Sequence, residues 1–113
     1  MGQHFDVREG TRSRTEAVAA IERAGYWPVT RMDLAGTFVD THWHPVNELV
    51  YLLQGELTFE HPDGERACLA AGQQLVLRAR TAHRVTTPAD ALYIVGMERI
   101  VPEDELFRVG VPS

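Results

Sequence analysis

Two histidines and a glutamate lie close together in the sequence and are residue types that bind metal ions. One residue separates His42 from His44, so in an extended strand both imidazoles project from the same face. Glu48 follows across Pro45-Val46-Asn47, a segment that can bend and place the carboxylate at the start of the next strand. Imidazole and carboxylate donors together suit a divalent transition metal. The three side chains can therefore reach one ion, with Glu48 also a candidate catalytic base, although on this spacing alone such histidines are more often part of the surface or the core.

Neighbouring positions on the same predicted strands are candidates for the wall of a substrate pocket. Phe38 and Asp40 share the parity of the two histidines, which predicts an apolar wall at Phe38 and a group at Asp40 that orients a ligand or a bound water. Val50 and Leu52 share the side of Glu48, so we expect the carboxylate at the mouth of an apolar channel. The last long strand has two faces, and the sequence leaves open which one lines the interior. One face carries Leu92 and Ile94, and the other carries Tyr93, Val95 and Met97.

One helix is expected before the strands, over residues 14–24. Ser13 and Glu16 have the spacing of a capping box, apolar residues then recur at helical spacing, and Gly25 ends the pattern. We expect this helix to pack over an opening of the main body or at a dimer interface, and we assign it no chemistry.

After Gly25 the chain consists of short runs of strand-forming residues separated by turn residues, which is typical of an antiparallel sandwich or barrel. The turns are expected at residues 54–55, 61–64, 71–72 and 87–90. The sequence thus predicts one all-β domain over 1–113, with a barrel over 27–99 and a tail over 100–113 that either packs on the surface or is loose. The expected strands are 27–34, 37–44, 48–54, 57–60, 65–69, 74–77, 83–87 and 91–99.

The composition excludes several classes of function. The 113 residues include no lysine, so neither a Schiff-base amine nor a phosphate-loop lysine is available. A formal net charge of -5 disfavours nucleic acid and anionic lipid as partners, and the apolar runs are too short to cross a bilayer. Cys68 is the single thiol, which rules out a disulfide within the chain and favours a cytoplasmic protein. We expect Cys68 to be a small buried side chain, and His4, in a loose N-terminus, and His61, in a turn, to have no role.

The glycines around the proposed donors resemble the first motif of the cupin superfamily, Gly-x5-His-x-His-x3-Glu-x6-Gly. Every specified position is met in this sequence, in the order Gly36, His42, His44, Glu48 and Gly55. The resemblance covers residues 27–99 and leaves only 16 residues between this motif and the second one. It is a resemblance to a small, single-domain cupin of the cupin 2 type.

The second cupin motif, Gly-x5-Pro-x-Gly-x2-His-x3-Asn, is met at Gly72 and His83. Three positions depart from it: Arg78, Arg80 and Thr87 stand where proline, glycine and asparagine are usual. An arginine at the glycine position is strained if the backbone there has a positive φ. The sequence leaves open whether Arg78 and Arg80 bind a substrate carboxylate or are solvated.

The resemblance implies a jelly-roll double-stranded β-helix in which His42, His44, Glu48 and His83 bind one divalent metal ion, either Fe, Mn, Ni, Co, Cu or Zn. It implies a small-molecule ligand, and an oxygenase, an isomerase or a decarboxylase acting on a small oxygenated or carboxylate metabolite. The alternative is a small-molecule-binding or sensing module without catalysis, and an empty barrel with hydrogen-bonded donors is a third reading. Trp43 alternates with the two histidines and should point outward, where its ring needs cover from the helix or from a second subunit. The second possibility predicts a homodimer, as cupins commonly form.

Overall fold

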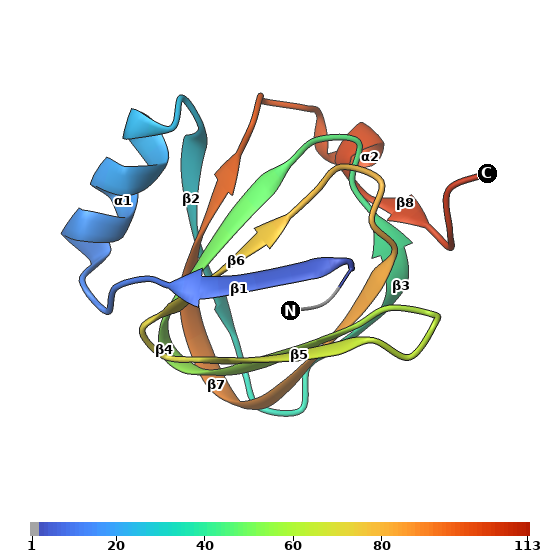
Figure 1. Ribbon diagram of the computed structural model, residues 1–113, viewed down its shortest axis with the longest axis horizontal. Helices are drawn as coiled ribbons and strands as arrows, with labels where there is room; N and C mark the ends of the chain where they lie inside the picture. The colour runs from blue at the N-terminus through green and yellow to red at the C-terminus, as the bar shows by residue number, and fades with distance from the viewer. Residues whose placement is uncertain (1–2) are drawn as a thin grey trace.

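The computed structural model describes residues 3–113, which form eight strands and two helices (Figure 1). The helices are α1 (Arg14–Arg23) and the short α2 (Glu103–Leu106). The strands are β1 (Phe5–Glu9), β2 (Trp27–Asp33), β3 (Phe38–Trp43), β4 (Glu48–Glu60), β5 (Arg66–Ala70), β6 (Gln73–Leu77), β7 (His83–Met97) and β8 (Arg108–Val109).

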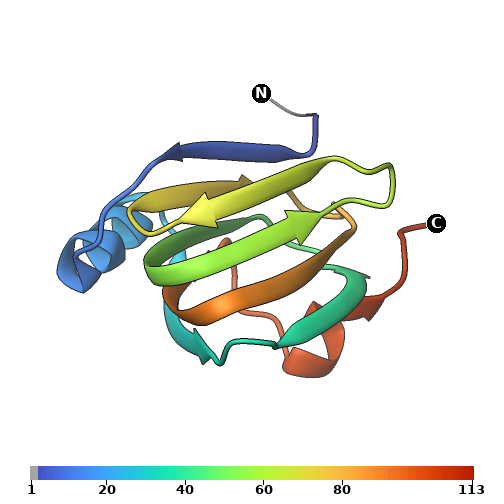
Figure 2. The same ribbon diagram turned by 90° about the horizontal axis from the view of Figure 1, so that it is seen from below.

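Two long strands, β4 and β7, run through the whole molecule and pair with each other from Glu48↔Met97 to Glu60↔Arg84. The first half of β4 pairs with β6 and its second half with β5, while β7 pairs first with β3 and then with β2. This change of partners divides the sheet into two layers (Figure 2). One layer has the order β1-β6-β4-β7-β2 and the other β5-β4-β7-β3-β8. This is the predicted antiparallel double-stranded β-helix, although the hydrogen-bonded path of the described strands does not close into a ring.

The expected hairpin turns at residues 54–55 and 87–90 are wrong, because both segments are bends inside β4 and β7. The pairing of the two strands shifts register between Leu52 and Thr58. Gly55 has φ 86°, and a Cβ atom at this position would lie 2.0 Å from the carbonyl oxygen of Asp90. The turn-forming residues at these two places therefore allow β4 and β7 to pass from one layer to the other. The turns expected at 61–64 and 71–72 do separate strands.

Helix α1 begins where its cap predicts. The Ser13 hydroxyl accepts a hydrogen bond from the Glu16 backbone amide at 3.2 Å. Ala17 and Ile21 are fully buried beneath the helix, and Ile21 packs directly on the backbone of Gly96 in β7. The helix covers the outer face of the first layer through a cluster made of Ala17, Ile21, Tyr51, Leu53 and Ile94. The helix thus packs on the main body as expected, but on a face of the sheet and not over the opening of the cavity.

Both ends of the domain are more ordered than the sequence predicts. The N-terminal segment is not loose, because Phe5–Glu9 pairs with β6. The tail forms α2 and then β8, which pairs with β3 at His42↔Val109. Cys68 is exposed on β5, so the prediction of a buried side chain is wrong. Within residues 3–113 we find no helix with the length and apolar character required to span a membrane.

Candidate metal centre

A cavity of about 480 Å³ lies between the two layers of the sheet. The side of β7 that faces it carries Tyr93, Val95 and Met97, which decides between the two sets left open by the sequence. Most of the wall is apolar, and the segment after β7 closes one part of it. The polar residues of the wall are Arg31, Asp33, His42, His44, Glu48, His83, Tyr93 and Glu103.

Three of these residues bring their imidazoles together. His42 in β3 pairs in register with His83 at the start of β7, and His44 follows the end of β3. Their ring centroids are 4.3 Å apart for His42 and His83, 4.9 Å for His42 and His44, and 5.2 Å for His44 and His83. One nitrogen of each ring lies within 4.8 Å of the others, which places the three histidines around a common point.

Each of the three rings is held by a backbone carbonyl. Nδ1 of His42 donates to the carbonyl of Asp40 at 2.7 Å, and Nδ1 of His83 donates to that of Thr81 at 2.8 Å. Nδ1 of His44 donates to the carbonyl of Leu106 at 2.9 Å. Because a carbonyl oxygen only accepts, the proton of each neutral ring is on Nδ1, and Nε2 keeps its lone pair. Metal-binding histidines are commonly oriented by such a bond on the opposite nitrogen.

Burial keeps the three imidazoles neutral. It lowers the pKa of His42 and of His44 below the ordinary value, and the Asp40 and Leu106 carbonyls oppose this shift only in part. For His83, burial and the neighbouring imidazole of His42 lower the pKa to about 3. Neutral imidazole is the form that binds a metal ion, so no proton has to be displaced from these rings at neutral pH.

Glu48 lies beside this group in a buried position. Its Oε1 is 3.7 Å from Nε2 of His44, and the residue is 6% exposed. Burial raises the pKa of Glu48 to about 7, and the positive charge of Arg31 opposes this shift. The pKa of His44 is lowered at the same time, so the contact is not an ion pair of two full charges at neutral pH. A cation held by the imidazoles would favour the ionised carboxylate.

The expected parity along β3 is broken by a bulge between Val39 and His42. As a result Val39 lines the cavity, whereas Phe38 is 56% exposed, and the prediction that Phe38 walls the pocket is wrong. Asp40 is also exposed, and its carboxylate accepts from the Thr41 amide at 2.7 Å. Asp40 nevertheless orients a candidate ligand through its main chain, since its carbonyl holds His42.

The two residues predicted to share the side of Glu48 have different positions. Val50 lines the cavity. Leu52 is fully buried in the hydrophobic core that continues below the cavity. Its side chain is not part of the cavity wall. The apolar channel expected next to Glu48 is therefore present, and Val50 rather than Leu52 forms its surface.

Sequence reasoning missed two parts of the site. Phe107 stacks on His42 with centroids 4.1 Å apart and planes 12° apart, and Leu106 supplies the carbonyl for His44. On the other side, Arg31 in β2 faces the cavity near Tyr93, whose hydroxyl donates to Asp33 at 2.6 Å. The alternating pattern of β2 could have indicated Arg31, but nothing in the composition of residues 100–113 indicated a contact with the histidines.

The loop before His83 carries the strain that its sequence suggests. Arg80, at the position where the second motif has glycine, adopts φ 66°, and its amide donates to the His44 carbonyl at 2.8 Å.

Thr87, at the asparagine position, is buried, and its hydroxyl has no hydrogen-bond partner among residues 3–113. Arg78 and Arg80 are both exposed. They lie outside the set of residues that lines the cavity.

Trp43 points away from the cavity, as its position between the two histidines predicts. Its ring is flanked by the guanidinium groups of Arg80, 5.0 Å from the ring centroid, and Arg108, 5.9 Å away. Part of the cover expected from a second subunit is thus supplied by cations of the same chain.

Comparisons with known proteins place this geometry in a family. Three solved structures share the fold: the DMSP lyase DddQ from Ruegeria pomeroyi (20% identity, TM-score 0.59), salicylate 1,2-dioxygenase from Pseudoaminobacter salicylatoxidans (14%, 0.57), and a DUF861 family protein from Thermotoga maritima (11%, 0.59). The alignments cover 66%, 63% and 82% of this chain, respectively. They cover 39% of the lyase chain, 20% of the dioxygenase chain and 98% of the Thermotoga chain.

No curated protein matches the chain. The family model described as the cupin domain matches residues 31–95, which is more than half of the sequence and includes all four predicted donors. The chain therefore belongs to the cupin family.

Proposed function

We propose that this chain is a metal-dependent enzyme that acts on a small oxygenated or carboxylate metabolite. His42, His44 and His83 would hold one divalent transition metal ion through Nε2, and Glu48 would add its carboxylate. The observation that carries the proposal is the set of three Nδ1–carbonyl hydrogen bonds, which leave three unprotonated nitrogens around one point of a cavity. Three imidazoles and one carboxylate fit Fe, Mn, Co, Ni, Cu or Zn.

Bound there, such an ion supplies Lewis acidity and, if it is redox-active, one-electron chemistry. The protein contributes a wall with many apolar side chains, which strengthens electrostatic contacts inside the cavity. Glu48 is the candidate base once its carboxylate leaves the ion, because it lines the cavity with Oε1 3.7 Å from Nε2 of His44.

Arg31 is the group that we assign to substrate binding. It faces the cavity, and no carboxylate of residues 3–113 lies within the 4.0 Å of an ion pair with it. Asp33 is engaged by the Tyr93 hydroxyl instead. A guanidinium that lies beside the Tyr93 hydroxyl and makes no ion pair is free to bind a carboxylate through two parallel hydrogen bonds, which favours a small carboxylic acid as substrate.

The structural neighbours are compatible with this proposal, since a lyase and a dioxygenase are among the proteins that share the fold. At these identities the likeness concerns the fold alone, and one fold supports many reactions. Oxygenation, isomerisation and decarboxylation therefore stand as alternatives for the reaction. Binding or sensing of a small molecule without turnover is the second candidate function.

The test starts from protein purified without a histidine tag. We expect elemental analysis to find about one equivalent of a transition metal more in the wild type than in His83→Ala. Oxygen consumption and product formation are then measured with a panel of small carboxylic acids. Turnover that requires the metal supports an enzyme, whereas a bound acid without turnover favours the sensing module. A wild-type protein that takes up no metal would contradict the proposal.

The homodimer predicted from Trp43 stays a prediction. Several large apolar side chains on and after β2 are exposed and could complete an interface, among them Trp27, Met32 and Leu34. Light scattering at micromolar concentration tests it, and a monomeric mass would count against it.

A further inference from the structure

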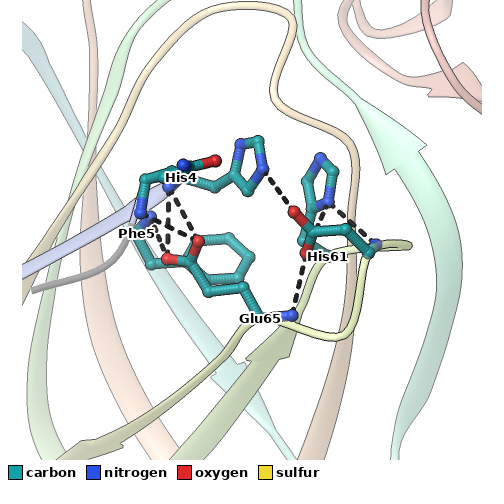
Figure 3. Close-up of polar contacts among 6 residues, drawn as sticks. His4, Phe5, His61 and Glu65 are labelled. Carbon is teal, nitrogen blue, oxygen red and sulfur yellow. Dashed lines mark hydrogen bonds and ion pairs between the residues drawn. The ribbon is translucent and has the colours of Figure 1, made fainter.

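A second group of metal-ligating side chains lies where the start of β1 meets the turn between β4 and β5 (Figure 3). Nε2 of His4 is 2.9 Å from Oδ2 of Asp63, and Nδ1 of His61 is 3.1 Å from Oδ1 of the same carboxylate. One candidate ligand atom from each residue lies within 4.8 Å of the others. None of these residues belongs to the cavity, so the group is independent of the candidate metal centre.

The backbone holds His4 in this position. The Glu65 carboxylate accepts hydrogen bonds from the successive amides of Gln3, His4 and Phe5, at 2.9 to 3.1 Å (Figure 3). Phe5 is 4% exposed and packs near Phe59 in the core. The chain is therefore anchored at His4 and immediately after it, which places the imidazole over the turn without help from an ion.

Hydrogen bonds satisfy most of the polar atoms, since Oδ1 of Asp63 accepts from the Glu65 amide at 2.9 Å and Oδ2 pairs with Nε2 of His4, but one contact remains between two acceptors. The Asp63 amide donates to Nδ1 of His61 at 3.1 Å, so this nitrogen has a lone pair. The same Nδ1 faces an oxygen of the Asp63 carboxylate, which also has only lone pairs when ionised, as Asp is at neutral pH. Two acceptors at this distance repel each other unless a proton or a cation lies between them.

The distances are close to those of a zinc site. Zinc bonds of about 2.0–2.2 Å put neighbouring ligands of a tetrahedral site about 3.3–3.6 Å apart. The observed separations of 2.9 and 3.1 Å need to open by only a few tenths of an ångström. The two rings are stacked at 3.5 Å with planes 4° apart, so both must turn about their Cβ–Cγ bonds to direct lone pairs at one ion. Their side chains are 27% and 19% exposed, which leaves room for this rotation and for entry of the ion.

We propose that His4, His61 and Asp63 form a second divalent transition-metal site that joins the start of β1 to the β4–β5 turn. Two imidazoles and one carboxylate suit zinc, with the fourth position open to water. The site combines two half-buried histidines with an exposed carboxylate and lies outside the cavity, so its role is to strengthen the attachment of β1 to the β4–β5 turn rather than to catalyse a reaction.

The test is a titration of the untagged, full-length protein with Zn²⁺, followed by calorimetry. If both sites bind, we expect two equivalents in the wild type, one in His61→Ala, one in His83→Ala and none in the double variant. Asp63→Asn should behave like His61→Ala, and Asp6→Asn, at a half-buried carboxylate of β1 that pairs with Arg8 outside the group, should behave like the wild type. In the His83→Ala background, Zn²⁺ should also raise the melting temperature, because the ion binds the folded state.

The outcomes separate this site from the one in the cavity. One equivalent in the wild type that is lost in His61→Ala supports the second site even though the cavity takes up no zinc. Two results would overturn the second site. In the first, the His83→Ala protein binds zinc, and adding His61→Ala or Asp63→Asn does not change this binding. In the second, the His83→Ala protein binds no zinc.

Discussion

Nδ1 of His44 donates a hydrogen bond to the backbone carbonyl of Leu106, a residue 62 positions away in the sequence. This bond fixes the tautomer of His44 and joins the C-terminal segment to the candidate metal centre. The next residue, Phe107, covers His42. The segment that orients one imidazole thus shields another, so access to the cavity and the geometry of the donors depend on the same few residues.

Replacing Phe107 should loosen the cover without unfolding the domain. The ring is 44% exposed, and an aromatic stack contributes only about 0.5–1.5 kcal/mol beyond its buried area. We expect Phe107→Ala to release metal to a chelator several times faster than the wild type, with a small loss of stability. Val109→Ala, at a residue that is 86% exposed in the same segment, is the control. Equal release rates in all three proteins would show that Phe107 is not a barrier.

Removing an imidazole should abolish metal binding in the cavity. We expect His44→Ala and His83→Ala to bind metal there at least about 100-fold more weakly, because loss of a group behind a ligand already costs 10- to 100-fold. Arg84→Ala is the matched control, since Arg84 is adjacent to His83 but pairs outward with Glu60 at 2.6 Å. Circular dichroism checks that the variants are folded. Unchanged occupancy of the cavity in both histidine variants would remove these residues from the ligand set.

Glu48→Gln keeps the shape of the side chain and removes the charge that a cation would favour. We expect metal affinity in the cavity to fall by about 10- to 100-fold. Glu56→Gln changes an exposed carboxylate of the same strand and should have no effect. Competition with a fluorescent chelator gives both constants. A titration curve identical to that of the wild type would show that Glu48 is not a ligand.

Arg31→Gln should weaken binding of small carboxylic acids while leaving the metal in place. Hydrogen bonds to a charged group contribute about 1.5–3 kcal/mol, which corresponds to a tenfold or larger loss of affinity. The measurement is calorimetric titration of the metal-loaded protein with the acid that binds the wild type best. Arg78→Gln, an exposed arginine outside the cavity, serves as the control. Equal loss in the two variants would point to a general charge effect.

The metal-free protein should lose stability in acid. The pKa of His83 is about 3 in the folded state against 6.5 in the unfolded chain, so the unfolded chain takes up this proton first as the pH falls below about 6.5, and stability is lost from there to about pH 3. The lowered pKa values of His42 and His44 act in the same direction. Glu48 acts in the opposite direction, since its folded pKa of about 7 exceeds 4.5 and adds stability as the pH falls between these values.

Each excess proton changes the free energy of unfolding by about 1.4 kcal/mol per pH unit, so the effects of His83 and Glu48 are similar and opposite above about pH 4.5, and the imidazoles dominate below it. With chelator present, we therefore expect a lower urea midpoint at about pH 3.5 than at about pH 7.5. His83→Gln should reduce the difference, and Glu48→Gln should enlarge it. A midpoint that rises toward acid pH would show that the imidazoles are not buried as neutral groups.

Much of the fold could be predicted because its signals are local. The cap at Ser13 and the apolar positions of α1 depend on residues three or four apart, and the structure confirms the helix. The alternating strand pattern predicts the all-β class for the same reason. The bends at Gly55 and near Asp90 could not be distinguished from hairpin turns, because the same residue types allow both, and only the pairing of β4 with β7 selects the bend.

The candidate site divides in the same way. His42, His44, Glu48 and His83 are identified by their spacing and by the cupin resemblance, and they do line one cavity. Phe38 was misplaced because one bulge reverses the parity of a strand, and that bulge arises from the pairing of β3 with β7.

The sequence by itself determined which donor atoms this protein has and which family of folds would gather them, because spacing and alternation are properties of neighbouring residues. Only the tertiary structure decided that Leu106 orients His44, that Phe107 covers His42, and that His4 meets His61 and Asp63. These contacts join residues that are far apart in the chain. They form only when the sheet has folded, because folding brings the N-terminal segment to the β4–β5 turn and the C-terminal segment to His42 and His44.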